Sequence, residues 1–447
     1  MASTSNADVS HPVVFTTQTA YPLPSQKFMI PASWRRYQLS QLVNKALSLE
    51  KPVPFDFLVR GEILRTTLGE WCAEKGIGEE ETLEIEYIES VMPPQKMSSL
   101  PHEDWVSCVS CQEPNYFFTA SYDGNIRIFD YAQSLLQTIP VHEAPSTSLT
   151  VIPSNANSDT RLIASASHDL TARLTQITLS TGPTASARTL ASLHLHTAPL
   201  TSITSNSSGS YLLTASNDGL IGFWDTSIPT TDEVALEEGT ERKKRRKVGE
   251  DQDTRPKRKA PLNVLKSHTA RVSKAIFVKS DNKTAVSAGF DSTVRTWDTE
   301  NGVCTNTITA SSKPFLDIAE LPSGQSVLAA STDRTVCQYD LRAAESATTA
   351  SVTTLHHSAT PSCIATSPSQ SPSSSEHQII TGAYDGVVRL WDLRSTKSAV
   401  TSFKVWEART GGRKVLSVDW TRGVVGIGGE GGVEVWRVGE GDRLVPS

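Results

Sequence analysis

The sequence predicts a protein dominated by β-strands, because one pattern of two short strands joined by a tight turn recurs along most of its 447 residues. The clearest copy, residues 379–392 (IITGAYDGVVRLWD), alternates in the period-2 manner of strands. Its Asp385-Gly386 pair favours a hairpin, since glycine tolerates the positive φ that such a turn needs. A Ser or Thr lies four residues before the turn aspartate, and an aromatic residue lies six after it. Repeats of this kind indicate a fold assembled from like units.

Three copies show this pattern in full and also carry a histidine upstream of the turn. In each copy the imidazole can donate to the aspartate and accept from the hydroxyl, and the tryptophan N–H can donate to the same hydroxyl. A buried polar set is stable only if every member has a partner, so these residues predict a structural role rather than catalysis or metal binding. The predicted tetrads are His196, Thr214, Asp218 and Trp224; His268, Ser287, Asp291 and Trp297; and His357, Thr381, Asp385 and Trp391.

These positions resemble the WD-repeat signature, and the resemblance implies a seven-bladed WD40 β-propeller whose blades are four-stranded sheets. Less complete copies surround Asp123, Asp169 and Asp333. The weakest copy, at 424–436, has Glu430-Gly431-Gly432 in place of the turn aspartate. The third strands of the seven blades are expected to end near Asp130, Thr175, Asp225, Asp298, Asp340, Asp392 and Arg437.

A separate unit precedes the repeats. Strand-like segments at 13–17 and 28–30 lead to a helix whose apolar residues share one face. A strand at 55–59, a short helix ended by Gly76 and a strand at 82–87 follow. This β-β-α-β-β order is typical of a ubiquitin-like β-grasp, so the predicted fold is an α+β domain followed by a propeller.

The domain boundaries follow from these segments and from shifts in composition. The stretch between the third and fourth blades is charged and lacks apolar periodicity, which predicts disorder. The outer strand that completes the ring could come from near Met92 or from near Leu444. The expected organisation is a disordered tail at 1–11, a ubiquitin-like domain at 12–92, a linker at 93–101, a propeller at 102–447 and a disordered basic insertion at 228–260.

Composition argues against several function classes. The net charge of −6 is not that of a protein whose whole surface binds nucleic acid. No apolar run is long enough to cross a membrane, and the polar first ten residues lack the apolar core of a signal peptide. The six cysteines include one CxxC, Cys108 and Cys111, without the second pair of a zinc site. No nucleophile elbow, P-loop or HExxH motif is present, so we expect no enzyme activity, no cofactor and no metal ion of its own.

The insertion carries two basic clusters. Basic clusters on a flexible loop suit the acidic grooves of nuclear import receptors, and they also attract phosphate, so RNA contact is a compatible second role. A solvated charged loop without a role is the remaining alternative. The predicted nuclear-localisation residues are Arg242, Lys243, Lys244, Arg245, Arg246 and Lys247 in the first cluster and Lys257, Arg258 and Lys259 in the second.

A more specific resemblance rests on four segments, at 50–58 (EKPVPFDFL), 64–68 (LRTTL), 83–87 (LEIEY) and 103–107 (EDWVS). Together with the basic insertion, they resemble the eukaryotic WD-repeat ribosome biogenesis factors that have an N-terminal ubiquitin-like (NLE) domain. The resemblance spans the whole chain. It implies a non-enzymatic assembly factor of the large (60S) pre-ribosomal subunit in the nucleolus and nucleoplasm of the nucleus, required for maturation of the large-subunit and 5.8S rRNAs.

The resemblance also implies two interfaces. The propeller would bind the block-of-proliferation protein, another WD-repeat protein, in a trimer with pescadillo, and no motif marks the residues involved. The ubiquitin-like domain would bind the metal-dependent adhesion domain of midasin, a AAA ATPase whose ATP hydrolysis removes the complex from the precursor. In the family pattern, a glutamate four residues after Gly76 and three before Leu83 completes the Mg²⁺ shell of midasin. That glutamate is Glu80, with Glu79 and Glu81 on either side.

A ubiquitin-ligase adaptor is the alternative function, because WD-repeat propellers also present substrates to ligases. The ubiquitin-like domain here runs on into residues 90–94 (SVMPP) and lacks the C-terminal Gly-Gly that conjugation needs. This difference argues against the alternative. Neither function calls for a membrane or a small-molecule substrate.

Overall fold

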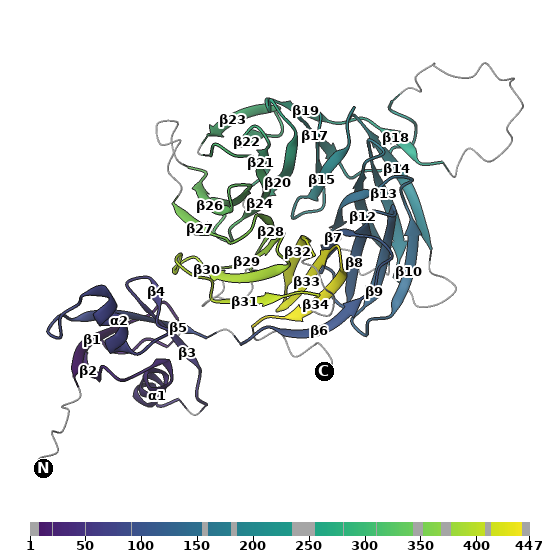
Figure 1. Ribbon diagram of the computed structural model, residues 1–447. Coiled ribbons are helices and arrows are strands. Elements are labelled where there is room, and N and C mark those ends of the chain that lie inside the picture. Colours follow the sequence, from purple (N-terminus) through teal and green to yellow (C-terminus); the bar gives the residue numbers. More distant parts are fainter. Residues whose placement is uncertain are drawn as a thin grey trace, which may run out of the picture.

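The computed structural model describes residues 9–439 except 20, 50, 91, 154–159, 180–185, 235–254, 280, 310, 343–351, 368–376 and 407–412. These residues form eight sheets, one in an N-terminal domain and seven arranged as a ring (Figure 1). Among the described residues, no helix is both long and apolar enough to span a membrane.

The N-terminal domain is a β-grasp, as predicted. Its sheet has the order β2-β1-β5-β3-β4, with β1 parallel to β5 and the other neighbours antiparallel. A core that includes Phe15, Phe57 and Tyr87 lies between this sheet and the helices. The tail predicted at 1–11 is too long, since β1 already begins at Ser10. The elements are β1 (Ser10–Thr16), β2 (Lys27–Pro31), α1 (Arg36–Leu47), β3 (Phe55–Val59), β4 (Glu62–Ile63), α2 (Leu68–Lys75) and β5 (Leu83–Glu89).

The ring is a seven-bladed propeller. Six of the third strands end at the predicted residue, and β13 runs three residues further, to Thr178. Blade 1 is β7 (Val106–Ser110), β8 (Tyr116–Ser121), β9 (Asn125–Asp130) and β10 (Leu135–Pro140); blade 2 is β11 (Ser146–Ile152), β12 (Thr160–Ser167), β13 (Thr171–Thr178), β14 (Ala187–His194) and β18 (Lys257–Lys259); blade 3 is β15 (Leu200–Ser205), β16 (Tyr211–Ser216), β17 (Leu220–Asp225) and β19 (Asn263–Lys266). Blade 4 is β20 (Val272–Val278), β21 (Asp281–Gly289), β22 (Val294–Asp298) and β23 (Val303–Ile308); blade 5 is β24 (Phe315–Glu320), β25 (Ser326–Ser331), β26 (Thr335–Asp340) and β27 (Thr353–His356). Blade 6 is β28 (Pro361–Thr366), β29 (Gln378–Ala383), β30 (Val387–Asp392) and β31 (Thr401–Lys404); blade 7 is β32 (Val415–Thr421), β33 (Val424–Gly429), β34 (Gly432–Arg437) and β6 (Gln95–Leu100).

The linker predicted at 93–101 is wrong, because Gln95–Leu100 forms β6, the outer strand of blade 7. It pairs antiparallel with β34, so the ring is completed from the N-terminal side. Only Ser98 and Leu100 of this strand are buried. The sequence therefore lacks the clear apolar alternation from which a strand could be predicted. The propeller therefore begins near residue 95, and the connection between the domains is shortened to a few residues.

The insertion predicted to be disordered at 228–260 is ordered at both ends. Residues 228–234 are described, and Lys257–Lys259 forms β18, which pairs in parallel with β14 as a fifth strand of blade 2. Lys259 is buried, and its Nζ lies 2.6 Å from a carboxylate oxygen of Asp225. This ion pair, together with Ser227 as a second acceptor, allows Lys259 to be buried. Lys259 is thus a structural residue, while the predicted residues Arg242–Lys247 lie outside the described part of the chain.

Candidate functional site

Two of the three predicted tetrads are complete. In blade 3, His196 Nε2 lies 2.8 Å from Thr214 Oγ1 and its Nδ1 lies 3.1 Å from Asp218, while Trp224 Nε1 donates to Thr214 Oγ1 over 2.9 Å. Blade 4 repeats the arrangement at 2.7–2.8 Å with His268, Ser287, Asp291 and Trp297. All these polar atoms have partners inside the blade, so the tetrads serve stability.

The tetrad predicted in blade 6 is incomplete. His357 and Trp391 both reach the hydroxyl of Thr381, at 2.9 and 3.1 Å, but His357 Nδ1 faces the Leu355 carbonyl instead of Asp385. Asp385 instead accepts from Arg389, at 2.6 Å, and from the hydroxyl of Ser358, at 3.1 Å. The prediction is wrong for this one contact.

Two histidine sites escaped the prediction. His142 bonds Asp169 and Ser165, both at 2.8 Å, although Thr175 stands where the tryptophan was required. His102 lies 2.8 Å from Thr119. Each bonded histidine lies four residues before the first residue of an inner strand, and this spacing is the signal that would have found both. The histidine series therefore covers blades 1, 2, 3, 4 and 6.

These buried histidines make stability depend on pH. Burial lowers the pKa of His102 and of His357 from 6.5 to about 4, so both are neutral in the folded state. The unfolded chain takes up protons below pH 6.5 that the folded chain does not, so stability is complete above pH 6.5 and lost as the pH falls toward 4. The loss is at most about 3 kcal/mol for each histidine. We expect the melting temperature to fall between pH 7 and pH 4.5, and calorimetry of His357→Asn to show a shallower fall. Equal pH profiles would contradict this assignment.

One end of the ring presents the residue that precedes each hairpin turn. In all seven blades its backbone N–H donates to the carbonyl of the residue just before the inner strand, over 2.8–3.2 Å. We call this set the turn face: Tyr122, His168, Asn217, Phe290, Thr332, Tyr384 and Glu430.

Aromatic side chains are frequent on the turn face, which includes Tyr122, Phe290 and Tyr384, and Trp105 lies directly beside it. The ring of Trp105 lies 5.9 Å from that of Tyr122, and Arg271 stacks 3.4 Å above the ring of Phe290. Trp105 and Tyr384 are 44% and 39% exposed. Exposed aromatic and arginine side chains are typical of the centres of protein–protein interfaces.

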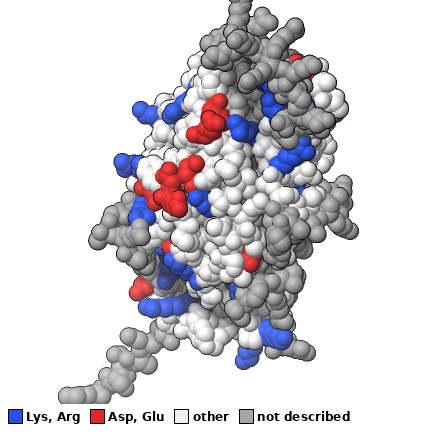
Figure 2. Space-filling view, turned by 90° about the vertical axis from the view of Figure 1, so that its right-hand side faces the viewer, with Lys and Arg blue, Asp and Glu red and all other residues white. Residues whose placement is uncertain are grey.

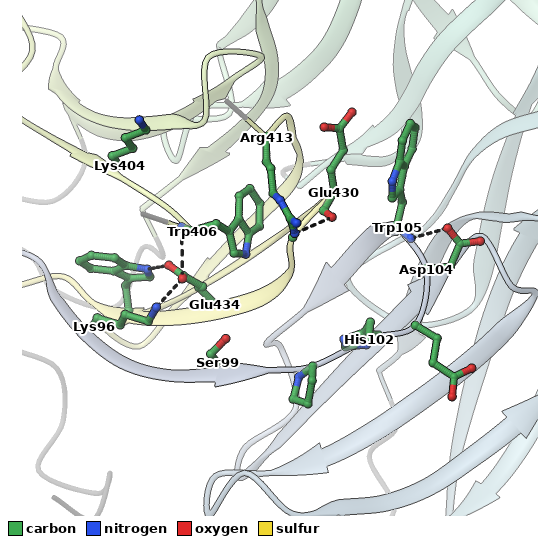
Figure 3. Close-up of a pocket in the computed structure, with 14 residues that line it drawn as sticks. Lys96, Ser99, His102, Asp104, Trp105, Lys404, Trp406, Arg413, Glu430 and Glu434 are labelled. Carbon is green, nitrogen blue, oxygen red and sulfur yellow. Dashed lines mark hydrogen bonds and ion pairs between the residues drawn. The ribbon is translucent and has the colours of Figure 1, made fainter. Parts of the chain in front are cut away.

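A pocket of about 630 Å³ lies beside the turn face, over blade 7 (Figure 3). Blade 7 has Ile427 in place of the hydroxyl residue. The indole of Trp406 packs against Gly429 and Gly431. The indole lies so close to Gly431 that a Cβ there would come within 2.4 Å of it. On the pocket floor, the buried carboxylate of Glu434 accepts from Trp436 Nε1 at 3.0 Å and from the backbone N–H of Trp406 at 3.2 Å, and it pairs with Lys96.

The rim of this pocket carries both signs of charge. Lys404 and Arg413 lie on one side, and Asp104 lies on the other beside Trp105 (Figure 3). Mixed charge around tryptophan rings suits a protein segment better than a polyphosphate backbone.

Glu80 lies on the exposed turn between α2 and β5. Thr67 and Glu70 form a capping box at the start of α2, and Gly76 ends the helix with a φ of +66°. Glu79, Glu80 and Glu81 follow on this turn, and Glu81 pairs with Arg60. Within the described residues, Glu79 and Glu80 have no hydrogen bond or ion pair, so their carboxylates face solvent.

In the part of the chain that the structure describes, no three His, Cys, Asp or Glu residues are grouped to hold a metal ion. Cys108 and Cys111 are free thiols, and burial raises the pKa of both. On the face shown in Figure 2, basic side chains are scattered among acidic ones, without a continuous basic surface on its described part.

Comparisons with known proteins match both parts of the chain. The NLE (NUC135) domain family matches residues 12–72, and the WD domain, G-beta repeat family matches 94–130, 187–225, 259–298 and 348–392. A protein of Laccaria bicolor named ribosome biogenesis protein YTM1 is 62% identical over 99% of this chain and 98% of its own length. The chain belongs to the YTM1 family of ribosome biogenesis proteins.

Other members of the YTM1 family extend the likeness. The protein of that name from Coprinopsis cinerea is 57% identical over 98% of this chain and 96% of its own, and that of Saccharomyces cerevisiae is 33% identical over 93% of both. The WD40 β-propeller domain of Doa1 matches with a TM-score of 0.57 and 16% identity, over 77% of this chain and 96% of that one, which supports the fold alone. As a YTM1-family member, the chain is a ribosome biogenesis factor with an NLE domain and WD40 repeats.

Proposed function

We propose that the chain is a non-enzymatic coupling subunit of nucleolar large-subunit precursors, needed to mature the large-subunit and 5.8S rRNAs. Its propeller binds the block-of-proliferation protein, in a trimer with pescadillo. Its ubiquitin-like domain binds the adhesion domain of midasin, which removes the complex. The observation that carries this proposal is the match to the YTM1 family over both domains at once.

The exposure of Glu80 supports the midasin contact. Mg²⁺ prefers oxygen ligands and often keeps positions open, so a carboxylate on an exposed turn can complete the shell of an ion held by another protein. Glu81 is less suited, because its carboxylate already pairs with Arg60. The NLE match ends at residue 72, so the role of Glu80 rests on this turn and on the family pattern.

The turn face supports a protein partner for the propeller. Its exposed aromatic side chains, with the mixed-charge pocket beside them, have the composition of a protein interface rather than that of a phosphate-binding groove. We therefore place the docking of the block-of-proliferation protein on this end of the ring.

Nuclear targeting is assigned to the first basic cluster. Deleting residues 242–247 is expected to weaken nuclear accumulation in fluorescence imaging while the melting temperature stays unchanged. Replacing Lys259 by Ala should instead lower the melting temperature, because Asp225 loses its buried partner. An unchanged nuclear signal in cells that lack the partner proteins would contradict the role of the first cluster.

A ubiquitin-ligase adaptor remains the second candidate, favoured only by the WD40 repeats themselves. Affinity purification of the tagged chain with mass spectrometry separates the two functions. We expect the block-of-proliferation protein, pescadillo, midasin and large-subunit precursor proteins. Recovery of ligase subunits in their place would overturn the proposed function.

A further inference from the structure

Within the described residues, the N-terminal domain meets the ring in two places. One is covalent, since β5 runs through a few residues into β6, the outer strand of blade 7 (Figure 1). The other is a polar contact with the segment 392–400 that follows β30, which we call the blade 6 corner. Which of these two connections gives way first determines how a force on the N-terminal domain reaches the ring.

The contact with the blade 6 corner is charged and close. Lys397 pairs with Glu62, Arg394 lies 3.5 Å from Glu86, and Arg65 donates to the carbonyl of Ala399. The guanidinium of Arg394 donates two hydrogen bonds to the Asp392 carboxylate, at 2.9 and 2.7 Å, which hold it in place. At Gly61, in the turn before β4, the backbone also comes close, because a Cβ there would lie 3.4 Å from the carbonyl oxygen of Arg394. The Lys397 side chain is 67% exposed, so its pair with Glu62 is expected to be weak and screened by salt. Arg394 and Glu86 are more covered, at 10% and 28% exposed.

Among the described strands, β6 is an edge strand with β34 as its one neighbour. The ladder begins with Gln95 opposite Arg437, at the end where the chain arrives from the N-terminal domain. A bulge interrupts the register between Val435 and Trp436, close to this end. A force that pulls Gln95 away from the blade acts on the hydrogen bonds between β6 and β34 one after another. Hydrogen bonds that bear the force singly break at a lower force than hydrogen bonds that share it.

Loss of β6 would dismantle the pocket beside the turn face. Lys96 and Ser99 of β6 line that pocket, and Lys96 neutralises the buried carboxylate of Glu434. Leu100, the last residue of β6, is buried in the core of blades 7 and 1, and the chain continues directly to the exposed Trp105.

We propose that β6 is a force-operated link between the two domains. Separation of the N-terminal domain from the blade 6 corner transfers the load to β6, which then detaches from β34 and dissolves the pocket of blade 7. A pull on the first domain thereby disrupts a surface on the second. The use of this link in the cell rests on the proposed function, whereas the link itself is a property of the isolated chain.

Single-molecule force spectroscopy on the full chain tests this link without any partner. Handles are attached through Tyr37→Cys on α1 and Val303→Cys on blade 4, two exposed positions. We expect a first low-force event as the N-terminal domain leaves blade 6. A second event should then lengthen the end-to-end extension by about 20 Å, as the six residues of β6 are released. Lys397→Ala should lower the force of the first event and leave the second unchanged.

A disulfide between Gln95→Cys and Arg437→Cys locks the entry end of the ladder. We expect oxidation to abolish the 20 Å event below the force that unfolds a whole domain, and reduction to restore it. Lys96→Met should lower the force of the same event without any disulfide. Identical traces for the oxidised, reduced and Lys96→Met chains would overturn the proposal, as would unfolding of the N-terminal domain before β6 detaches. Because midasin is absent, these outcomes are independent of the role of Glu80.

Discussion

Replacing Glu80 by Ala is expected to abolish the metal-dependent binding of the chain to the adhesion domain of midasin. A missing carboxylate leaves the Mg²⁺ shell open at one position, and loss of even an outer-shell partner typically weakens a metal site about 10- to 100-fold. We therefore expect a loss of affinity of about 100-fold or more in titration calorimetry with Mg²⁺ present. Wild-type chain in EDTA should bind as poorly as the variant.

Matched controls lie on the same turn. Glu79→Ala removes a neighbouring carboxylate that also faces solvent, and Glu81→Ala removes one that pairs with Arg60. Both should bind midasin nearly as well as the wild type, and all three variants should still bind the block-of-proliferation protein. Full binding by Glu80→Ala, or loss of binding by Glu79→Ala alone, would reject the assignment.

The largest loss of stability is expected from Thr214→Val in the tetrad of blade 3. Valine has nearly the shape of threonine, so the change removes the hydroxyl that His196 and Trp224 share and leaves two buried polar atoms unpaired. Each unpaired group costs about 1–3 kcal/mol, so we expect a loss of about 3 kcal/mol in the free energy of unfolding. Thermal melting of the full chain measures it as a lower transition temperature of the propeller.

Thr214→Ser is the control for this prediction. It keeps the hydroxyl and loses one methyl group, and blade 4 already uses serine at the equivalent Ser287. We expect it to cost about 1 kcal/mol. Equal melting temperatures for the valine and serine variants would show that the hydrogen-bonded chain contributes nothing to stability.

Local patterns in the sequence predicted much of the ring, because each blade repeats the same short-range chemistry. The hairpin around Asp385-Gly386 and the spacing from Thr214 to Trp224 depend only on residues close in the chain. The same approach missed His142, whose blade has Thr175 where a tryptophan was required. It also assigned Asp385 to His357, whereas in the structure Asp385 accepts from Arg389 and Ser358.

Long-range pairings could not be predicted in this way. β6 has few buried side chains, and its position depends on β34, more than three hundred residues away in sequence. β18 consists of three basic residues, and the burial of Lys259 depends on Asp225 and Ser227, which lie in another part of the chain. That the carboxylate of Glu80 is unpaired also depends on the folded turn, because Arg60 pairs with Glu81 and not with Glu80.

Sedimentation of the tagged chain through a gradient of nuclear extract tests the coupling role most directly. We predict that wild-type chain migrates with large-subunit precursors, together with pescadillo and the block-of-proliferation protein, and that the Glu80→Ala chain accumulates there. Migration of the wild-type chain with ligase subunits, apart from any precursor particle, would contradict the account.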